Sequence, residues 1–280
     1  MYRLLKERTS EMKNLFDVTN KTVVITGGMG QLGTQYTKTL LENGTKVAVF
    51  DINIEKKNAY FKSQENNPNL KLYKVDITKK EDIKQALERV VEDLGKPSVL
   101  INNAALDVPP GSSADESGPF ENYPEKSWDK TVEVNLKGMF LTCQIVGGFM
   151  AENGGGSIIN ISSIYGNVSP DQRIYEYRAK GGKPFFKPVS YSVTKAGVIN
   201  LTRYLATYWA PKKVRVNTLS LGGVFNNQDE QFLKEYVKRV PMGRMANEDE
   251  YNGAILFLAS EASSYMTGSN LIIDGGWTAW

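Results

Sequence analysis

The sequence predicts one α/β domain, a doubly wound and mostly parallel sheet of seven strands with helices on both faces. Short β-branched runs alternate with longer helical patterns along the 280 residues, which is typical of repeated strand–helix–strand units with right-handed crossovers. Most of the short runs are almost continuously apolar, as expected for strands buried on both faces of a parallel sheet. No internal repeat, low-complexity tract or Pro/Ser linker divides the chain.

The expected elements follow one another in regular order. The strand candidates are the apolar runs at 21–26, 46–51, 71–76, 98–103, 157–162, 214–220 and 271–274. Helical patterns lie between them, at residues 31–43, 80–94, 124–151, 190–210 and 248–260. Irregular segments are expected at 105–125, 164–189 and 222–230. The domain therefore covers residues 20–280, and residues 1–19 are interpreted as a separate N-terminal helical arm.

Composition excludes several kinds of chemistry. The chain has no histidine, and Cys143 is its only cysteine, so a Ser-His-Asp triad, His-ligated zinc, a cysteine cluster and an internal disulfide are excluded. No metal site is expected, and proton transfer must use Tyr, Lys, Asp, Glu or Ser. The net charge of +3 is too small to favour a nucleic-acid partner. Without a secretion signal or a membrane-spanning apolar segment, we expect a cytoplasmic protein with no membrane partner.

A glycine-rich turn follows the first strand directly. Gly28, Gly30 and Gly33 in ITGGMGQLG match the G-x-G-x-x-G spacing of a dinucleotide-binding turn, although a plain tight turn is the alternative. Glycine lets the backbone approach a pyrophosphate at the N-terminus of the next helix. Asp51 ends the second strand, where a carboxylate can accept hydrogen bonds from both ribose hydroxyls of NAD and repel a 2′-phosphate. The alternative for Asp51 is a helix N-cap; both interpretations agree with NAD rather than NADP as the cofactor.

Tyr191 and Lys195 lie four residues apart in YSVTK, at the start of a helical pattern. This spacing places both side chains on one face of a helix. A nearby ammonium favours phenolate and would lower the pKa of the tyrosine towards working pH. The pair is therefore a candidate for acid–base chemistry.

Together these motifs resemble the short-chain dehydrogenase/reductase family, over residues 20–280. The resemblance also rests on the sequences VDIT with Asp76, INNAA (101–105), VNLKG with Asn135, INISS with Ser163, SLGGV (220–224) and TGSNLIIDGGW (267–277). It implies a Rossmann-fold domain and an NAD(P)-dependent oxidoreductase acting on CH–OH groups. The alternative from another class is a catalytically silent NAD-binding module.

The resemblance also implies roles for individual residues. Tyr191 would be the general acid/base, Lys195 would lower its pKa and hold the nicotinamide ribose, and Ser163 would hydrogen-bond the reacting oxygen. Asn135 would anchor a water linked to Lys195. The implied cofactor-binding residues are Gly27, Gly30, Gln31, Leu32, Asp51, Ile52, Asp76, Ile77, Asn103, Ala104, Ala105, Tyr191, Lys195, Gly222 and Val224.

Four positions depart from the usual family pattern. The glycine turn has the spacing T-G-x-x-G-x-x-G, with Gln31 where a glycine is usual. Ala105 replaces the usual glycine after NNA, Leu221 replaces a proline, and Asn226 replaces a threonine. These changes concern the details of cofactor contact.

The interval from Ser163 to Tyr191 is longer than the family's usual interval, which predicts an insertion at about 166–189 beside the substrate mouth. Residues 169–188 carry five Lys/Arg against two Asp/Glu. Because Arg pairs well with carboxylate and phosphate, Arg173 and Tyr175 are expected to close over a polar, anionic sugar-like substrate. Tyr165 and Asp107, the latter in the facing loop 107–120, complete the expected substrate site. The alternative is a solvated loop or a subunit contact.

Longer phrases, among them ISSIYGNVSPDQRIYE and GRMANEDEYNGAILFLAS, resemble oxidoreductases found with bacterial surface-glycan and flagellin-modification genes, including enzymes linked to legionaminic-type sugars. This resemblance implies a sugar or sugar phosphate as substrate; a general ketone or polyol reductase is the alternative. The patterns at 124–151 and 190–210 have more apolar positions than one sheet contact needs. Family members commonly pair these helices, so a homotetramer or homodimer is expected.

Overall fold

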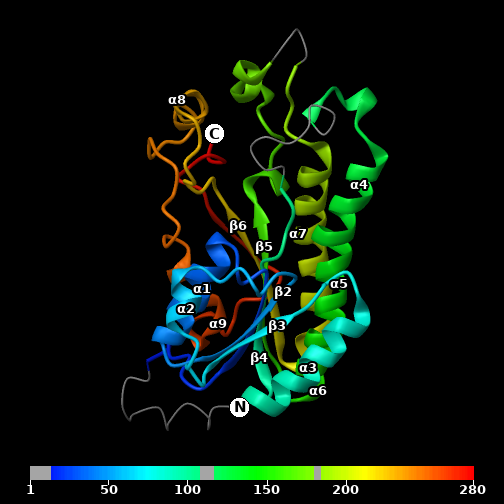
Figure 1. The fold of residues 1–280 in the computed structure, drawn as a ribbon, viewed down its shortest axis with the longest axis vertical. Helices are drawn as coiled ribbons and strands as arrows, with labels where there is room; N and C mark the ends of the chain where they lie inside the picture. The colour runs from blue at the N-terminus through cyan, green and yellow to red at the C-terminus, as the bar shows by residue number, and fades with distance from the viewer. Residues whose placement is uncertain (1–13, 108–116, 180–183) are drawn as a thin grey trace, which may run out of the picture.

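Seven parallel strands form the middle layer of the fold in the order β3-β2-β1-β4-β5-β6-β7 (Figure 1). The computed structural model describes residues 14–107, 117–179 and 184–280. The strands are β1 (Thr22–Thr26), β2 (Lys46–Asp51), β3 (Leu70–Lys74), β4 (Pro97–Asn102), β5 (Gly156–Ser163), β6 (Val214–Leu221) and β7 (Asn270–Ile273). Each coincides with a predicted run, and the predicted doubly wound sheet is confirmed. Strand order reverses between β1 and β4, where ligands bind in sheets of this kind.

Helices cover both faces of the sheet (Figure 1). One face carries α3 (Lys80–Leu94), α7 (Val189–Trp209) and a long helix over residues 125–152. Their apolar sides pack with residues of the sheet such as Val24 and Ile158. The other face carries α1 (Gln31–Glu42) and α9 (Asn252–Ala259), which pack against residues such as Ile25 and Ile159. The β-branched side chains therefore point alternately into two buried layers, which explains their continuous apolar runs.

The long helix contains two π-helical turns. It runs through α4 (Glu125–Val132), η3 (Glu133–Gly138), α5 (Met139–Thr142), η4 (Cys143–Gly147) and α6 (Gly148–Glu152). π turns of this kind are often found at functional sites. The first one contains Asn135.

Two short helices were not predicted from the sequence. They are α2 (Ala59–Ser63) and α8 (Glu230–Val237), and each begins at a side-chain cap. Asn58 accepts a hydrogen bond from the Phe61 amide, and Asp229 accepts one from the Phe232 amide. Helices this short gain their stability from caps and packing rather than from a sustained hydrophobic period, so pattern analysis does not detect them.

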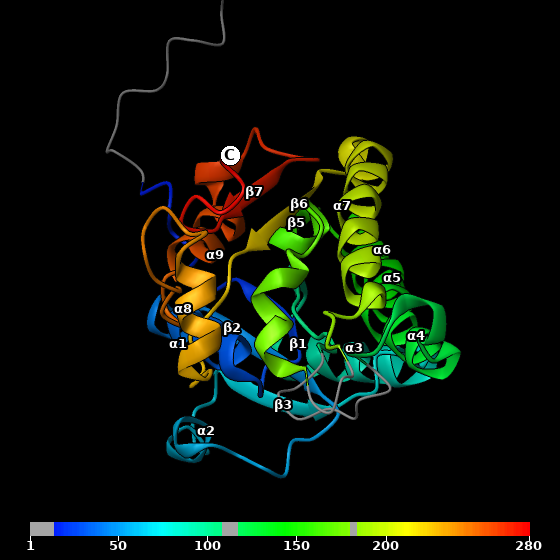
Figure 2. The same ribbon diagram turned by 90° about the horizontal axis from the view of Figure 1, so that it is seen from above.

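The described part of the predicted insertion, residues 166–179 and 184–189, contains 3₁₀ turns rather than being wholly irregular. It contains the 3₁₀ turns η5 (Ile164–Gly166) and η6 (Gln172–Arg178), and η6 contacts α8. From above, this green helical turn lies beside α8, over the end of the sheet where β5 finishes (Figure 2). The expected N-terminal arm lies mostly outside the described residues, and residues 14–19 form turns. Among the described helices, none is both long enough and apolar enough to span a membrane.

Candidate active site

The candidate site lies at the carboxyl ends of β1, β4, β5 and β6, beside the N-terminus of α7. The glycine turn follows β1, Asn103 to Ala105 follow β4, Ser163 ends β5, and Gly222 follows β6. Tyr191 and Lys195 enter from the first turns of α7. Because the strands are parallel, residues from distant parts of the sequence meet along one edge of the sheet.

The glycine turn is closely packed at two positions. Gly27 has a φ of +62°, and a Cβ on it would lie 2.7 Å from the Ala104 Cα. A Cβ on Gly33 would lie 2.3 Å from the Gly27 carbonyl oxygen. At Gly30 the same test gives an ordinary contact of 3.4 Å with that oxygen. The turn therefore brings bare backbone to the N-terminus of α1, which is the cradle a pyrophosphate requires.

Asp51 connects this turn to the end of β2. One carboxylate oxygen accepts a hydrogen bond from the Met29 amide at 3.0 Å, and the other accepts one from the Asn53 amide at 3.0 Å. A carboxylate has about four lone-pair positions, so both oxygens can accept a further bond from a ribose hydroxyl. Ile52 follows with an exposed apolar side chain, as the flat face of an adenine would require. These residues fit a dinucleotide.

The loop after β4 is hydrogen-bonded to the glycine turn. The Asn103 side-chain amide donates to the Gly27 carbonyl at 2.9 Å, and the amides of Asn103 and Ala104 donate to the Thr26 hydroxyl at 3.1 Å. Gln31, at the position where the family pattern has glycine, donates from its side chain to the Phe225 carbonyl at 3.0 Å. It thereby joins α1 to the loop after β6.

The other predicted cofactor residues lie around the same crevice. The Asp76 carboxylate accepts hydrogen bonds from the amide and hydroxyl of Thr78; these bonds hold its pKa below the usual value although partial burial opposes them. Ile77 is buried below Gly138 in the first π turn. The remaining members are Leu32 in α1, Ala105 after β4, Gly222 after β6, and Val224, which forms a β-bridge with Ala246.

Tyr191, Ser163 and Lys195 form the centre of the site. The Ser163 hydroxyl lies close enough to the Tyr191 hydroxyl to interact with it. The Lys195 ammonium lies 5.6 Å from the centroid of the Tyr191 ring and donates to the Ile161 carbonyl at 3.0 Å. Burial raises the pKa of Tyr191, and the nearby Asp107 charge adds to this effect, whereas the Ser163 hydrogen bond opposes it. Burial also lowers the pKa of Lys195 to about 8.

The two serines at the end of β5 have different partners. The Ser162 hydroxyl is buried and donates to the Lys195 main-chain carbonyl at 2.8 Å, which holds β5 against α7. Ser163 is the one whose side chain meets Tyr191. The geometry therefore gives Ser163 the place beside a reacting oxygen and gives Ser162 a structural contact.

Asn135 connects three segments around the site. Its side-chain oxygen accepts from the Leu106 amide at 2.7 Å, and its side-chain amide donates to the Leu106 carbonyl at 2.9 Å and to the Thr194 hydroxyl at 3.3 Å. The side chain is 1% exposed, so these bonds form without competition from solvent. Asn135 thus holds the loop after β4 against the helix that carries Tyr191 and Lys195.

The predicted substrate residues separate into two groups. Tyr165 and Tyr175 are buried with their hydroxyls 3.3 Å apart, in an apolar cluster with Tyr236 and Trp277. Arg173 does not join them, because its guanidinium binds Asp171 at 2.8 Å and its side chain is 76% exposed. Most of the facing loop that was expected to complete the substrate site, 108–116, lies outside the described residues.

Lys187 is a further site residue, and no motif in the sequence marks it as one. Its ammonium pairs with the Asp107 carboxylate and lies 4.9 Å from the centroid of the Tyr191 ring. The Gln172 side chain hydrogen-bonds the Lys187 backbone on both sides, accepting from its amide at 2.8 Å and donating to its carbonyl at 3.4 Å. In the sequence Lys187 is one of five basic residues in the insertion, and no feature distinguishes it from the other four.

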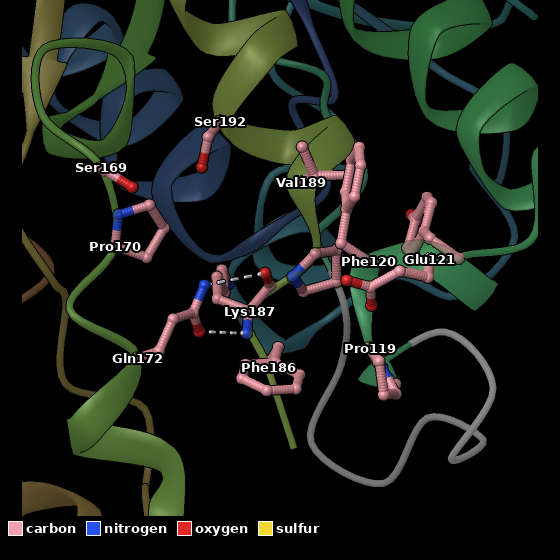
Figure 3. Close-up of a pocket in the computed structure, with 13 residues that line it drawn as sticks. Pro119, Phe120, Glu121, Ser169, Pro170, Gln172, Phe186, Lys187, Val189 and Ser192 are labelled. Atoms are coloured by element: carbon pink, nitrogen blue, oxygen red, sulfur yellow. Dashed lines mark hydrogen bonds between the residues drawn. The ribbon is translucent and has the colours of Figure 1, made fainter. Parts of the chain in front are cut away.

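A cavity of about 360 Å³ adjoins this lysine (Figure 3). Its walls combine the apolar side chains of Phe120, Phe186 and Val189 with polar groups. In Figure 3 Ser192 points from α7 towards Pro170, and its hydroxyl is buried with no hydrogen-bond partner among the described residues. Lys187 lines the cavity and also contacts Tyr191, so it connects the cavity to the centre of the site.

Comparison with known proteins identifies the family. A family model described as enoyl-(acyl carrier protein) reductase matches residues 29–278. The chain belongs to the short-chain dehydrogenase/reductase family. A crystal structure of a short-chain dehydrogenase from Leptospira borgpetersenii with bound NAD⁺ is 35% identical, with a TM-score of 0.82, and the match covers 96% of this chain and 97% of that one. The predicted family and its NAD(P)-dependent oxidoreductase class are therefore confirmed.

Relatives of this dehydrogenase/reductase include enzymes named for small polyols and sugars. An NAD-dependent glycerol dehydrogenase from Listeria innocua is 33% identical over 269 residues, covering 94% of this chain and 96% of the relative. An NADH-dependent L-xylulose reductase from Ambrosiozyma monospora is 32% identical over 278 residues, covering 92% and 94%.

Proposed function

We propose that the protein is an NAD(H)-dependent dehydrogenase that interconverts a secondary alcohol of a small polyol or sugar and the corresponding ketone. The observation that carries this proposal is the assembly of Tyr191, Ser163 and Lys195 at the crevice beside the glycine turn. Bound there, the nicotinamide of the cofactor supplies the acceptor or donor of the hydride.

Each group has a part that its surroundings support. In the oxidation direction the Tyr191 phenolate accepts the proton of the substrate hydroxyl, and in reduction the phenol returns it to the carbonyl oxygen. The Ser163 hydroxyl donates a hydrogen bond to the same oxygen. The Lys195 ammonium provides the positive potential that favours phenolate, against the burial that raises the pKa of Tyr191. Asn135 keeps the loop after β4 and α7 in register through its three hydrogen bonds.

We propose NAD rather than NADP because of Asp51. Its carboxylate is held at the glycine turn by the Met29 and Asn53 amides, with both oxygens able to accept from ribose hydroxyls. A 2′-phosphate at the same place would meet a negative charge.

A neutral polyol or ketose agrees better with the charges than an anionic sugar. The described cations of the insertion have local partners: Arg173 binds Asp171, Lys187 binds Asp107, and Arg178 lies 3.9 Å from the centroid of the Phe185 ring. The glycerol and xylulose names of the relatives support the same class. Arg173 is therefore not among the substrate residues that we propose. A role in surface-glycan synthesis has only the phrase-level sequence resemblance as support.

The test is NADH formation from NAD⁺ with a panel of polyols, including glycerol, xylitol and arabinitol, beside the same panel with NADP⁺. We expect activity with at least one polyol and a clear preference for NAD⁺. The Tyr191→Phe variant keeps the ring and loses the proton-transferring hydroxyl, so its kcat should fall by about 10²-fold or more.

Tyr177→Phe is the matched control, because that tyrosine binds Asp229 at the surface of the insertion. It should retain near-normal kcat. Retention of full activity in the Tyr191 variant, or turnover of none of the polyols by the natural protein, would contradict the proposed function.

A further inference from the structure

We propose that Lys187 and Asp107 form a charge-neutral clamp that binds the hydroxyl next to the reacting carbon, so that the enzyme selects vicinal diols over simple secondary alcohols. This inference rests on the proposed function, because it concerns the substrate class of the same site. Lys187 would be a substrate-binding residue, in addition to the groups that transfer the proton.

The position of Lys187 is the first observation. Its ammonium lies 4.9 Å from the centroid of the Tyr191 ring, and its side chain is 12% exposed. A lysine ammonium is strongly hydrated and is rarely buried without a function or a firm partner. Here it is held within reach of any group that lies beside the Tyr191 ring.

The second observation is that the position is built by the fold. Gln172 in η6 hydrogen-bonds both the amide and the carbonyl of Lys187, which fixes the backbone where the chain enters α7. Pro188 follows and limits the backbone further. Since Gln172 and Lys187 both belong to the insertion, the inserted segment places this ammonium beside the catalytic tyrosine.

The third observation is the partner. Asp107 follows β4 on the opposite side of the site, its side chain is 50% exposed, and its carboxylate pairs with the Lys187 ammonium. An ammonium has three donors and a carboxylate has about four acceptor positions, so Lys187 can donate to a second group and Asp107 can accept from several donors at once.

A hydroxyl has complementary properties. It can accept a hydrogen bond from Lys187 and donate its own proton to Asp107, and hydrogen bonds to charged groups are stronger than those between neutral groups. A neutral hydroxyl leaves the charge of the pair balanced, whereas a carboxylate or phosphate would compete with Asp107. The pair therefore favours a polyol, with one hydroxyl at Tyr191 and Ser163 and its neighbour in the clamp.

The test compares two alcohols that differ in that one hydroxyl, 2,3-butanediol and 2-butanol, as substrates with NAD⁺. Each stereoisomer is measured. We expect the natural protein to prefer a diol by about tenfold or more in kcat/KM, because a site built for a hydroxyl discriminates against the analogue that lacks it. Lys187→Met should reduce this preference about tenfold, chiefly by lowering kcat/KM for the diol. Lys187→Arg, which keeps the charge and donors, should recover part of it.

Lys238→Met is the matched control, because it removes an ion-paired lysine that directly follows α8. It should leave the ratio between the two alcohols unchanged. If Lys187→Met lowers kcat/KM for both alcohols equally, or shifts the pH profile equally for both, Lys187 acts on Tyr191 or on the fold and the clamp is overturned, while Tyr191-dependent polyol oxidation stands. A natural protein that oxidises polyols without preferring the diol would also overturn the clamp. Turnover of no polyol would overturn the proposed function itself.

Discussion

Lys195 is a charged side chain in a buried position, 3% exposed, at the start of α7. Burial lowers its pKa from 10.5 to about 8, because the ammonium loses its hydration, although the Asp107 charge partly compensates. The Ile161 carbonyl is its hydrogen-bond acceptor. At neutral pH the protein therefore keeps an ammonium in the site against its own stability, as functional sites often do.

The Lys195→Met variant is expected to be more stable than the natural protein at pH 7, by at most about 3 kcal/mol, and inactive. Below pH 8 lysine is charged in both the folded and the unfolded chain, so the natural protein carries the full penalty. The penalty falls as the pH rises from about 8 to 10.5, because the folded chain loses the proton first, so the gain should be smaller at pH 10. Urea unfolding at pH 7 and pH 10 measures this gain in the free energy of unfolding. A variant less stable than the natural protein at both pH values would contradict the proposed penalty.

At this scale the sequence could predict residues that belong to local motifs. Tyr191 and Lys195 are four residues apart, and Ser163 and Asn135 lie in short phrases, so each could be placed without knowing the fold. Lys187 could not, because its partner Asp107 is 80 residues away and only the fold brings them together. For Arg173 the sequence was misleading. An arginine in this segment suggested a site for an anionic substrate, but the Asp171 carboxylate two residues away binds it.

The described part of the insertion packs against α8 through η6. Asp171 begins η6 by accepting a hydrogen bond from the Arg173 amide, and its carboxylate also binds the side chains of Arg173 and Arg239. Hydrogen bonds from Arg173 and Arg239 hold the pKa of Asp171 well below its usual range. Ile174 and Tyr175 fill the apolar cluster below. The turn that holds Lys187 through Gln172 is thus anchored at its start.

Two substitutions at Asp171 distinguish the contribution of its helix cap to stability from the contribution of its ion pairs. Asp171→Asn keeps a capping oxygen and loses the charge, so it should lower the free energy of unfolding by less than about 1 kcal/mol. Asp171→Ala loses both, and we expect a loss of about 1–2 kcal/mol. Urea unfolding measures the difference, and hydrogen exchange should show faster exchange in residues 172–178. Equal stability of both variants and the natural protein would contradict an anchoring role.

Among the elements, those with a sustained period or a continuous apolar run could be predicted. All seven strands and the helices α1, α3 and α7 are of this kind. The helices α2 and α8 have eight residues or fewer and depend on Asn58 and Asp229 caps that also occur in ordinary loops. The π turns were not predictable either, because Asn135 and its neighbours fit an α-helical pattern equally well.

The whole molecule has an exposed aromatic surface on the helical face opposite α1. Tyr204 and Tyr208 on α7 are 65% and 64% exposed, and their rings stack with centroids 6.1 Å apart. Phe140 on α5 is also exposed. Exposed apolar patches of this kind commonly mark protein–protein contacts. That the protein forms a homotetramer or homodimer stays a prediction, and we propose this surface as the contact between its subunits.

Replacing Tyr204 and Tyr208 together by Glu should place like charges in the contact and reduce the mass measured by light scattering. In a symmetric contact both subunits carry the new charges, so the repulsion between the subunits is larger than if only one of them were changed. Lys62→Glu with Gln64→Glu near the end of α2, away from α7, is the control and should leave the mass unchanged. A monomeric natural protein at micromolar concentration would contradict the prediction.

At the scale of the whole chain, alternation of strand and helix patterns was sufficient to predict the fold, and the joint presence of several motifs was sufficient to predict the family. The substrate was not predictable in the same way. It depends on which partners the described cations of the insertion have, and the fold sets those partners, such as the Phe185 ring for Arg178 and the Asp107 carboxylate for Lys187.

The central claim is hydride transfer from the carbinol carbon of a polyol to NAD⁺, with Tyr191 taking the proton. The most direct measurement uses a polyol deuterated at its secondary carbons and follows the label by mass spectrometry of the NADH formed. We expect deuterium in the NADH produced by the natural protein and at least about 10²-fold less labelled product with Tyr191→Phe. Unlabelled NADH from the labelled polyol, or equal labelling by the Tyr191 variant, would contradict it.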